Sequence, residues 1–526
     1  MTYDYVIVGA GSAGCVLANR LSEDRNRRVL LIEAGPSDWH PFIHMPAGIA
    51  KLVGKKGINW NYLTEPETQL DNRRLWWPRG RVLGGSSSIN AMCYIRGIPA
   101  DFDDWAQRTG DPRWAWDNVL RYFRRSEGNT RGDDALHGGD GPLGVQDLRY
   151  HNRLTDAFVA AAQSCGHPHN DDFNGAAQEG VGQYQVTQRN SARCSSATAY
   201  LRPAKDRSNL TLQTGAQTER VLFDGQRAIG VDYRRHGRLT RAEAKETILC
   251  GGAINSPQLL MLSGIGPADA LRRHGIRVER DLRGVGENLQ DHLDICTLQN
   301  CTQPVSYDRL NDVAVLFKYL TRRDGPGTSN IAEAGGFVRT RHAQDARCDL
   351  QFHFIPALLD DHGRNRLPGY GYTLHACMLR PRSRGAIRLA SADPRVNAAI
   401  HANYLSDADG YDLKMLVEGV RMSREIFAAG AFDAFRGPEI FPGADAKSEA
   451  DIVAFIRRKA ETVYHPVGTC RMGNDEDAVV DSEMRVRSVS GLRVVDASVM
   501  PCLPGGNTNA PTIMIAERAA DLIVAA

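Results

Sequence analysis

A glycine-rich turn between two apolar runs near the N-terminus restricts the fold of this chain more than any other feature. Its parts, in chain order, are residues 5–8 (YVIV), the G-x-G-x-x-G motif at Gly9, Gly11 and Gly14, residues 29–32 (VLLI), and Glu33. Between the two runs, small and apolar residues recur at the i, i+3, i+4, i+7 spacing of a helix. The pattern predicts a strand, a tight turn, a helix, a second strand and an acid, which is the order of a dinucleotide-binding unit.

Each part of this motif has a chemical role in holding a dinucleotide. Gly9 permits the tight turn, Gly11 lets a pyrophosphate approach the backbone, and Gly14 lets the helix pack closely on the strand. The helix N-terminus carries partial positive charge that suits phosphate, and Glu33 can accept hydrogen bonds from ribose hydroxyls. The motif predicts dinucleotide binding without distinguishing FAD from NAD. The alternative is a glycine-rich turn that holds no ligand.

Two further glycine-rich segments lie within apolar surroundings. Residues 80–97 (GRVLGGSSSINAMCYIRG) join paired glycines and three serines to a run that contains Asn90. Such a segment suits a flat polar ring that the backbone approaches closely, although a flexible polar loop has the same composition. Residues 247–266 indicate a strand, a glycine turn and a helix, a junction found at the ligand edge of open α/β sheets. A purely structural βα unit would look the same.

Two segments near the C-terminus contain the candidate catalytic side chains. In residues 463–473 (VYHPVGTCRMG), His465 lies in a turn, where a histidine is usually structural. Residues 492–523 predict a strand that ends near Asp496, a loop, and a helix from about Thr512, with Asn507 just before the helix. Because a helix N-terminus carries partial positive charge, it would stabilise the negative charge of a reduced flavin.

Composition excludes several classes of function. The chain has 526 residues, and its 64 basic and 62 acidic side chains leave a formal net charge of +2, which argues against a nucleic-acid binder. Eleven cysteines without CxxC or Cys/His ligand spacing indicate neither a disulfide framework nor a metal site. No apolar run reaches the roughly 18 residues of a spanning helix, and no leader pattern precedes the first strand. We therefore expect a cytoplasmic protein with reduced thiols, and peripheral membrane association stays open.

These segments occur together in an order that closely resembles the glucose–methanol–choline (GMC) oxidoreductases, in their bacterial choline dehydrogenase-like and alcohol dehydrogenase-like branch. The resemblance covers essentially the whole chain. It implies an α/β fold class of the two-domain α+β kind, in which a discontinuous Rossmann-like FAD-binding domain carries a substrate domain built on an antiparallel sheet. The expected FAD-binding segments are residues 1–155, 195–298 and 460–526, and the expected substrate-binding segments are residues 156–194 and 299–459.

The resemblance also implies which residues hold FAD. They are Gly9, Gly11, Gly14, Glu33, Gly84, Gly85, Ser86, Asn90, Met92, Val221, Asp496, Ala497, Asn509 and Thr512. Among them, Val221 would contact the adenine side through its backbone. Some members attach FAD through a histidine that follows the serines of the second glycine-rich segment. Ile89 occupies that place here, so we expect non-covalent FAD.

The same resemblance implies that His465 and Asn507 are catalytic. The expected reaction oxidises a primary alcohol to the aldehyde: His465 takes the alcohol proton, flavin N5 takes the hydride, and Asn507 donates a hydrogen bond to the developing alkoxide. The expected partners are a small-molecule alcohol and an electron acceptor, which is a quinone, an electron-transfer protein or O2. The alternatives are an oxidase that releases H2O2 and a non-redox, FAD-containing hydroxynitrile lyase.

Three other ionisable residues could be either structural or functional. His353 and His375 lie in apolar strand-like runs, where we expect core packing or pocket lining rather than catalysis. Glu333, in the segment NIAEAGGF, has two interpretations. It is either a carboxylate that recognises the cation of choline or a structural acid, and we favour the second.

Overall fold

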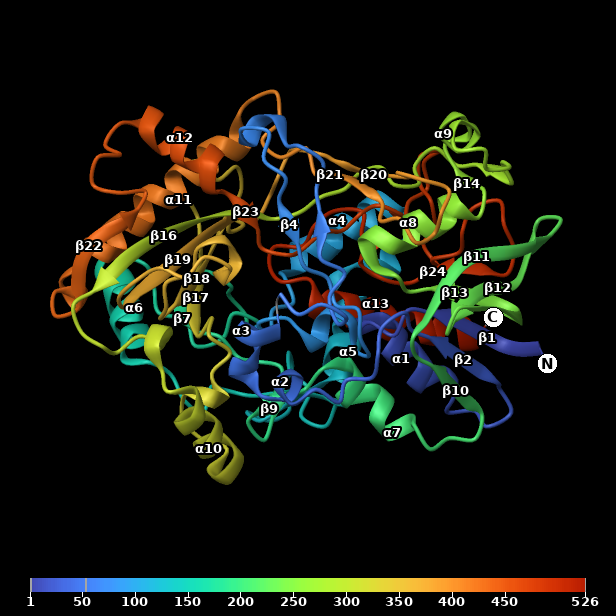
Figure 1. Cartoon of the computed structure of the whole chain (residues 1–526), viewed down its shortest axis with the longest axis horizontal. Coiled ribbons are helices and arrows are strands. Elements are labelled where there is room, and N and C mark those ends of the chain that lie inside the picture. Colours follow the sequence, from blue (N-terminus) through green and yellow to red (C-terminus); the bar gives the residue numbers. More distant parts are fainter. Residues whose placement is uncertain (1, 53, 526) are drawn as a thin grey trace.

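The structure is a computed structural model that describes residues 2–52 and 54–525, and its two large sheets lie on opposite sides of the molecule (Figure 1). The first sheet contains the predicted dinucleotide unit. Its strands, in spatial order, are β10 (Leu210–Gln213), β2 (Val29–Ile32), β1 (Thr2–Val8), β13 (Arg238–Leu249), β12 (Arg227–Arg235) and β11 (Ala216–Asp224), and β24 (Leu492–Val494) pairs with β13. Strands β10, β2, β1, β13 and β24 are parallel, whereas β11, β12 and the start of β13 form an antiparallel meander.

Helices α1 (Ser12–Leu21) and α13 (Asn509–Val524) pack against each other beside this sheet. All four residues of β2 are buried, as expected for a strand covered on both faces. Helix α13 begins at Asn509, so the expected start near Thr512 was wrong. The backbone N–H of Thr512 already donates to the carbonyl of Thr508, which places the first helical turn before Thr512.

The second sheet is antiparallel throughout. Its strands, in spatial order, are β22 (Arg436–Phe441), β16 (Leu293–Cys301), β19 (Gly371–Met378), β18 (Leu350–Ile355), β17 (Ala334–Val338) and β7 (Gly180–Gln183), and β23 (Glu461–Thr462) pairs with β16. Helix α11 (Tyr411–Ala428) packs on β16 and β19. A parallel-core sheet joined to an antiparallel sheet confirms the expected fold class.

The remaining elements connect and cover the two sheets. The other helices are α2 (Pro41–His44), α3 (Ile49–Leu52), α4 (Pro99–Thr109), α5 (Trp116–Ser126), α6 (Arg153–Ser164), α7 (Arg202–Ala204), α8 (Gly252–Leu262), α9 (Ala268–Arg273), α10 (Asp312–Arg322) and α12 (Glu449–Lys459). Two-stranded pairs are β3 (Tyr62–Leu63) with β4 (Trp76–Trp77), β5 (Glu127–Asn129) with β6 (Leu143–Val145), β8 (Gln188–Arg189) with β9 (Ala192–Arg193), β14 (Ile265–Gly266) with β15 (Arg280–Asp281), and β20 (Ala386–Arg388) with β21 (Ala399–His401).

The expected domain ranges remain a prediction, and the strand pairing bears on two of their boundaries. Strand β16 crosses the boundary expected at residue 298, and seven of its residues pair with β19. Strand β23 lies just inside the segment expected to start at residue 460, yet it pairs with β16 in the antiparallel sheet. The strands with which a strand forms hydrogen bonds decide to which sheet it belongs. These short apolar runs do not reveal their partners.

Two expectations about covalent chemistry and membranes concern the whole chain. All eleven cysteines are free thiols, nine of them buried, as expected. Within residues 2–52 and 54–525, no helix has the length and apolar character needed to cross a membrane.

Candidate active site

A cavity of about 410 Å³ reaches from the carboxyl ends of β1 and β2 to strands β18 and β19 of the antiparallel sheet. Thirteen of the sixteen residues expected in the site line it. They are Gly9, Gly11, Glu33, Gly85, Ser86, Asn90, Met92, His465, Asp496, Ala497, Asn507, Asn509 and Thr512. Their individual roles remain predictions, but the fold brings these segments, far apart in sequence, to one cavity.

The three glycines of the first motif differ in what surrounds them. A Cβ on Gly14 would lie 1.9 Å from the carbonyl oxygen of Gly9, and a Cβ on Gly9 would lie 2.5 Å from that of Cys250. Both positions therefore need glycine for close packing of the backbone. A Cβ on Gly11 would meet nothing within 4 Å. Because Gly11 lines the cavity, the space beside it is available to a ligand.

Glu33 directly follows β2, and its side chain is hydrogen-bonded to the glycine-rich turn after β1. Its two carboxylate oxygens accept the backbone N–H groups of Ala10 at 2.9 Å and Gly35 at 2.8 Å. Burial raises the pKa of this carboxyl group to about 7. The carboxylate retains further lone pairs at the cavity wall, so it can also accept hydrogen bonds from a ribose.

Three expected residues lie outside the cavity lining. Gly14 and Gly84 support the turns from behind; a Cβ on Gly84, whose φ is +86°, would lie 2.3 Å from Ser88 Oγ. Val221 is the third, and its N–H donates to Ser263 Oγ at 2.8 Å, so that N–H is not available to a ligand. The expected contact of its backbone with the adenine side remains a prediction. The start of the same strand lines the cavity through residues 216–218.

The second glycine-rich segment is fixed by a buried arginine that the sequence did not single out. Asn90 Oδ1 accepts hydrogen bonds from Met92 N at 3.1 Å and from Arg193 Nη1 at 2.8 Å. Arg193 also donates to the carbonyl oxygens of Ile43 and Ser87. Burial lowers the pKa of its guanidinium to about 9. The only sequence signal for this role is a single arginine between small and polar residues in the run from 190 to 198.

His465 reaches the cavity because the preceding backbone turns sharply. Tyr464 has a φ of +74°, a left-handed conformation that is strained for a non-glycine residue. Asp291 fixes the backbone of His465, because its Oδ1 accepts the N–H of His465 at 2.7 Å. Its Oδ2 accepts the Thr462 hydroxyl at 2.6 Å. Burial raises the pKa of Asp291 to about 6.

A second histidine determines which nitrogen of His465 carries the proton. His292 Nε2 lies 3.2 Å from the carbonyl oxygen of Leu379, which can only accept, so this nitrogen bears hydrogen. His292 Nδ1 is then an acceptor, and it lies 3.0 Å from His465 Nδ1. His465 therefore carries its proton on Nδ1 and presents an unprotonated Nε2.

The amide of Asn507 completes this chain of contacts. Asn507 Nδ2 donates to His465 Nε2 at 3.2 Å, and Asn507 Oδ1 accepts from Gln351 Nε2 at 3.1 Å. These two bonds define the orientation of the amide, with its N–H2 group toward the histidine. The expected pair of His465 and Asn507 is thus in contact within the cavity.

Burial keeps His465 neutral. Its pKa is held well below the usual value, first by desolvation and then by the neighbouring His292, His353 and Arg79. His353 lines the cavity as well, and burial lowers its pKa to about 3. A neutral imidazole with an unprotonated Nε2 is the form that can accept a proton, once the alcohol hydroxyl takes the place of the Asn507 donor at that nitrogen.

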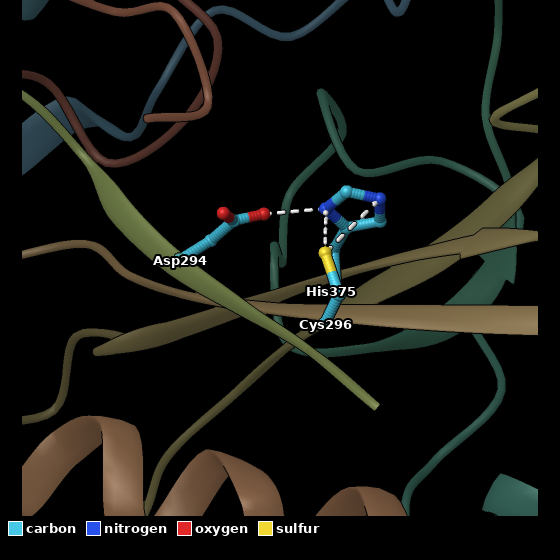
Figure 2. Close-up of side chains that lie close together, drawn as sticks. All are labelled: Asp294, Cys296 and His375. Carbon is cyan, nitrogen blue, oxygen red and sulfur yellow. Dashed lines mark hydrogen bonds and ion pairs between the residues drawn. The ribbon is translucent and has the colours of Figure 1, made fainter. Parts of the chain in front are cut away.

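His375 also lines the cavity, and it belongs to a buried cluster with Asp294 and Cys296 (Figure 2). Its Nδ1 is hydrogen-bonded to Asp294, and Cys296 Sγ lies 3.2 Å from Nδ1 and 3.6 Å from Nε2. Because the sulfur is close to both nitrogens, it does not lie along the in-plane lone pair of either one. These residue types can bind metals, but the arrangement is that of a polar cavity wall.

Glu333 is a structural acid, the interpretation that we favoured. Its carboxylate accepts hydrogen bonds from Asn152 N at 2.7 Å, Thr155 Oγ1 at 2.6 Å and Ser329 Oγ at 2.6 Å, and it also contacts the hydroxyl of Tyr307. It does not line the cavity. With its oxygens occupied inside the protein, it has no group to offer a cationic substrate.

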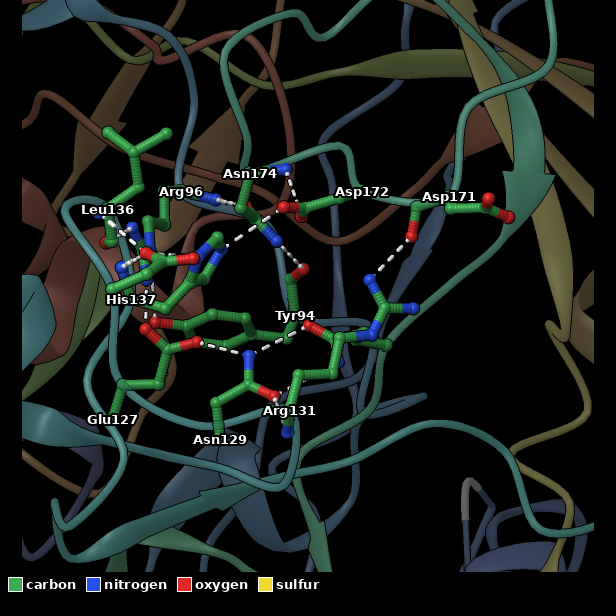
Figure 3. A network of polar contacts seen from close by, with 12 residues as sticks. Tyr94, Arg96, Glu127, Asn129, Arg131, Leu136, His137, Asp171, Asp172 and Asn174 are labelled. Carbon is green, nitrogen blue, oxygen red and sulfur yellow. Dashed lines mark hydrogen bonds and ion pairs between the residues drawn. The ribbon is translucent and has the colours of Figure 1, made fainter.

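A buried ion pair anchors the segment that follows Met92 (Figure 3). Arg96 pairs with Glu127, and both side chains are fully buried. Arg96 also donates to the carbonyl oxygen of Leu136 and to the Tyr94 hydroxyl. Asn174 joins the same network through Arg96 N and Tyr94 O. The network connects the cavity-lining loop to β5 and to two surface loops.

The lining of the cavity fits FAD. The glycine turn with open space at Gly11, the acid at the end of β2 and the N-terminus of α13 offer the groups that a dinucleotide needs. Asn90, Met92 and His465 line the same cavity. These residues would hold the cofactor along the path between the two sheets.

Comparisons with known proteins agree with this geometry. The chain is 51% identical to the alcohol dehydrogenase [acceptor] of Pseudomonas putida, with 99% of this chain and 96% of that protein covered. It is 47% identical to mitochondrial choline dehydrogenase of Mus musculus, with 99% and 89% covered. A structure of Aspergillus oryzae formate oxidase, described for an effect on FAD modification, superposes with a TM-score of 0.93 at 28% identity, covering 100% of this chain and 98% of that one. The models of the GMC oxidoreductase family match residues 3–294 and 381–516, and this chain belongs to that family.

Proposed function

We propose that the protein oxidises an apolar primary alcohol to the aldehyde with FAD as its cofactor. One observation carries this proposal: the unprotonated Nε2 of His465 and the amide of Asn507 lie 3.2 Å apart in the wall of the cavity that also contains the dinucleotide turn. A base and a hydrogen-bond donor beside a hydride acceptor are the groups that alcohol oxidation needs.

The residues divide the chemistry between them. FAD, when bound, supplies the acceptor for the hydride that leaves the alcohol carbon. His465 Nε2 accepts the hydroxyl proton, and His292 stabilises the resulting charge by accepting the Nδ1 proton of the same ring. Asn507 donates a hydrogen bond to the substrate oxygen as negative charge develops there. Holding the alcohol between these groups lowers the entropic cost of bringing the reacting atoms together.

The wall near His465 favours an uncharged substrate. Among the described residues, the carboxylates that line the cavity are Glu33 and Asp496, which come from the nucleotide-binding sheet. The part near the antiparallel sheet combines the apolar side chains of Ile331, Ile355, Leu359 and Val463 with the imidazoles of His353, His362 and His375, and no carboxylate lines it among the described residues. Choline would leave its cation without a carboxylate partner there, so the likeness to choline dehydrogenases does not extend to substrate in this proposal.

The electron acceptor that reoxidises FAD is proposed to be a quinone or an electron-transfer protein. The support is the 51% identity to a protein whose name specifies an acceptor. A cytoplasmic location and peripheral association with a membrane belong to the same proposal. Direct use of O2 is the alternative.

An anaerobic screen tests the reaction. The holoenzyme is mixed with alkyl and aryl primary alcohols and, in parallel, with choline, and the flavin absorbance is followed. We expect an apolar alcohol to bleach the flavin and to yield one aldehyde per flavin, and choline to bleach it far more slowly. A protein that no alcohol bleaches but that cleaves a cyanohydrin would be a lyase, which contradicts the proposal. Adding a quinone or O2 to the reduced protein then identifies the acceptor.

A further inference from the structure

Arg193 lacks the carboxylate partner that the other buried arginines of the described chain have. Four arginines are buried there, each at most 3% exposed. Three of them lie within ion-pair distance of an acidic side chain, namely Arg96, Arg493 and Arg518. Among residues 2–52 and 54–525, Arg193 has no such partner. Charges buried in proteins are as a rule paired, so we expect a bound group to supply the counter-charge.

The guanidinium of Arg193 is held by neutral acceptors. Nε donates to the carbonyl of Ile43 at 2.8 Å, and Nη1 donates to the carbonyl of Ser87 at 3.1 Å. Nη1 also donates to the carbonyl and to Oδ1 of Asn90, at 2.7 and 2.8 Å. Nη2 is buried and has no hydrogen-bond partner in the described chain. Carbonyl dipoles solvate a cation but leave its charge in place.

This charge lies directly behind the wall of the active-site cavity. Asn90, which accepts from the guanidinium, lines the cavity, whereas Ser87 does not. The segment that contains both residues also contacts the dinucleotide turn, because a Cβ on Gly85 would lie 2.7 Å from Gly11 Cα. A ligand that extends from that turn along this segment would therefore lie within the field of the Arg193 charge.

The carboxylates that line the cavity do not neutralise Arg193. Glu33 is hydrogen-bonded to two backbone N–H groups of its own turn. Asp496 accepts from the backbone of Gly252 and Ser498 and from the hydroxyl of Ser256. Burial raises the pKa of both carboxyl groups, that of Glu33 to about 7. The pyrophosphate of FAD is negative in both oxidation states, and reduction adds charge to the flavin, so FAD brings the charge that Arg193 lacks.

We propose that Arg193 supplies the counter-charge of bound FAD from behind the cavity wall. It is a positioning residue that acts through Asn90, and it does not touch the cofactor. The proposal deepens the proposed function, on which it rests for the identity of the cofactor. Charge on the phosphates would make Arg193 strengthen FAD binding, and charge gained on reduction would make it raise the reduction potential.

Two measurements on the holoenzyme at pH 7 test this role. The FAD that dissociates on dilution is followed by its fluorescence and gives Kd, and a reference dye gives the midpoint potential of bound FAD. Two unit charges roughly 10 Å apart in a protein change an equilibrium constant about tenfold. We therefore expect Arg193→Gln to weaken FAD binding about tenfold and to lower the potential by up to about 30 mV, the equivalent of tenfold for two electrons.

Arg193→Lys separates the charge from the hydrogen bonds. Lysine retains a positive charge but cannot reproduce the planar set of donors. We expect its unfolding midpoint to fall as in Arg193→Gln, while its Kd for FAD stays within about threefold of the wild type. The matched control is Arg189→Gln, on β8 of the same hairpin. Arg189 is exposed and donates to the carbonyl of Pro142, so solvent screens its charge, and we expect unchanged Kd and potential.

Asn90→Asp tests the unpaired charge with Arg193 in place. Its carboxylate can accept the hydrogen bonds that Asn90 Oδ1 accepts and gives the guanidinium an ion-pair partner. We expect the apoprotein of this variant to unfold at a higher temperature than that of the wild type. An apoprotein that is less stable than the wild type would overturn the premise that Arg193 is unpaired.

Two further results would overturn the proposal. One is a folded Arg193→Gln variant with wild-type Kd and potential. The other is an equal weakening of FAD binding in the Gln and Lys variants, because the hydrogen bonds rather than the charge would then matter. Weaker binding in the Gln variant alone, at an unchanged potential, would support the proposal and assign the charge to the phosphates. A wild-type protein that does not bind FAD would contradict the proposed function instead.

Discussion

Replacing His292 tests whether this buried residue positions the catalytic base. His292 is fully buried, and it is the acceptor for the Nδ1 proton of His465 at 3.0 Å. In His292→Leu, that proton loses its partner in a buried site, or the ring adopts the other tautomer, whose Nε2 is protonated and cannot accept from an alcohol. His292→Gln can instead donate to Leu379 through its amide and accept from His465 through its oxygen.

The expected loss of rate follows from removing one hydrogen bond in a fully buried place. Leaving a buried donor without a partner costs about 1–3 kcal/mol, which corresponds to about 5- to 150-fold in rate at 1.36 kcal/mol per factor of ten. We expect His292→Leu to lower the limiting rate of flavin reduction within that range, with a nearly unchanged apparent Kd for the alcohol. We expect His292→Gln to stay within a few-fold of the wild type.

Anaerobic stopped-flow measurement of flavin bleaching over a range of alcohol concentrations separates the limiting rate from substrate binding. FAD content and the unfolding midpoint of each variant report whether the fold survives. A wild-type limiting rate in His292→Leu would refute the reasoning. Equal losses in the Leu and Gln variants would also refute it, because the shape of the side chain rather than its acceptor would then matter.

Three further predictions follow from packing at the cavity and its supports. Gly11→Ala should leave the apoprotein as stable as the wild type but weaken FAD binding in a titration, whereas Gly14→Ala should lower the unfolding midpoint, because its Cβ would lie 1.9 Å from a backbone oxygen. FAD should leave the protein on acid precipitation, because Ile89 cannot form a covalent link; a yellow pellet would contradict this. Glu127→Ala should lower the free energy of unfolding by about 3–5 kcal/mol, because it leaves the fully buried guanidinium of Arg96 without its ion-pair partner. Arg131→Ala breaks an exposed pair with Asp147 and should lower it by under about 1 kcal/mol.

The dinucleotide half of the site could be predicted because its chemistry is local in sequence. Gly9, Gly11 and Glu33 follow strands whose apolar runs identify them, and parallel strands bring their carboxyl ends to one edge. Val221 was expected from the resemblance alone, and it does not line the cavity. The residues of its strand that do line the cavity lie at the start of that strand, and a position within a meander strand depends on register.

The support of His465, the proposed base, could not be predicted, because it depends on contacts between distant segments. His292 and His465 are 173 positions apart, and their contact becomes visible only when β16 and β23 are paired. The sequence did carry a signal at this place: two polar residues, Asp291 and His292, directly precede a buried strand. Polar residues at such a boundary are candidates for the support of a site.

The rate of flavin reduction in His465→Ala, measured anaerobically at saturating alcohol, tests the central claim most directly. The account predicts that the variant retains FAD and the wild-type fold, but reduces the flavin about 10²- to 10⁴-fold more slowly, since the proton of the alcohol has lost its acceptor. A variant that binds FAD and reduces it at nearly the wild-type rate would contradict the assignment of His465 as the base.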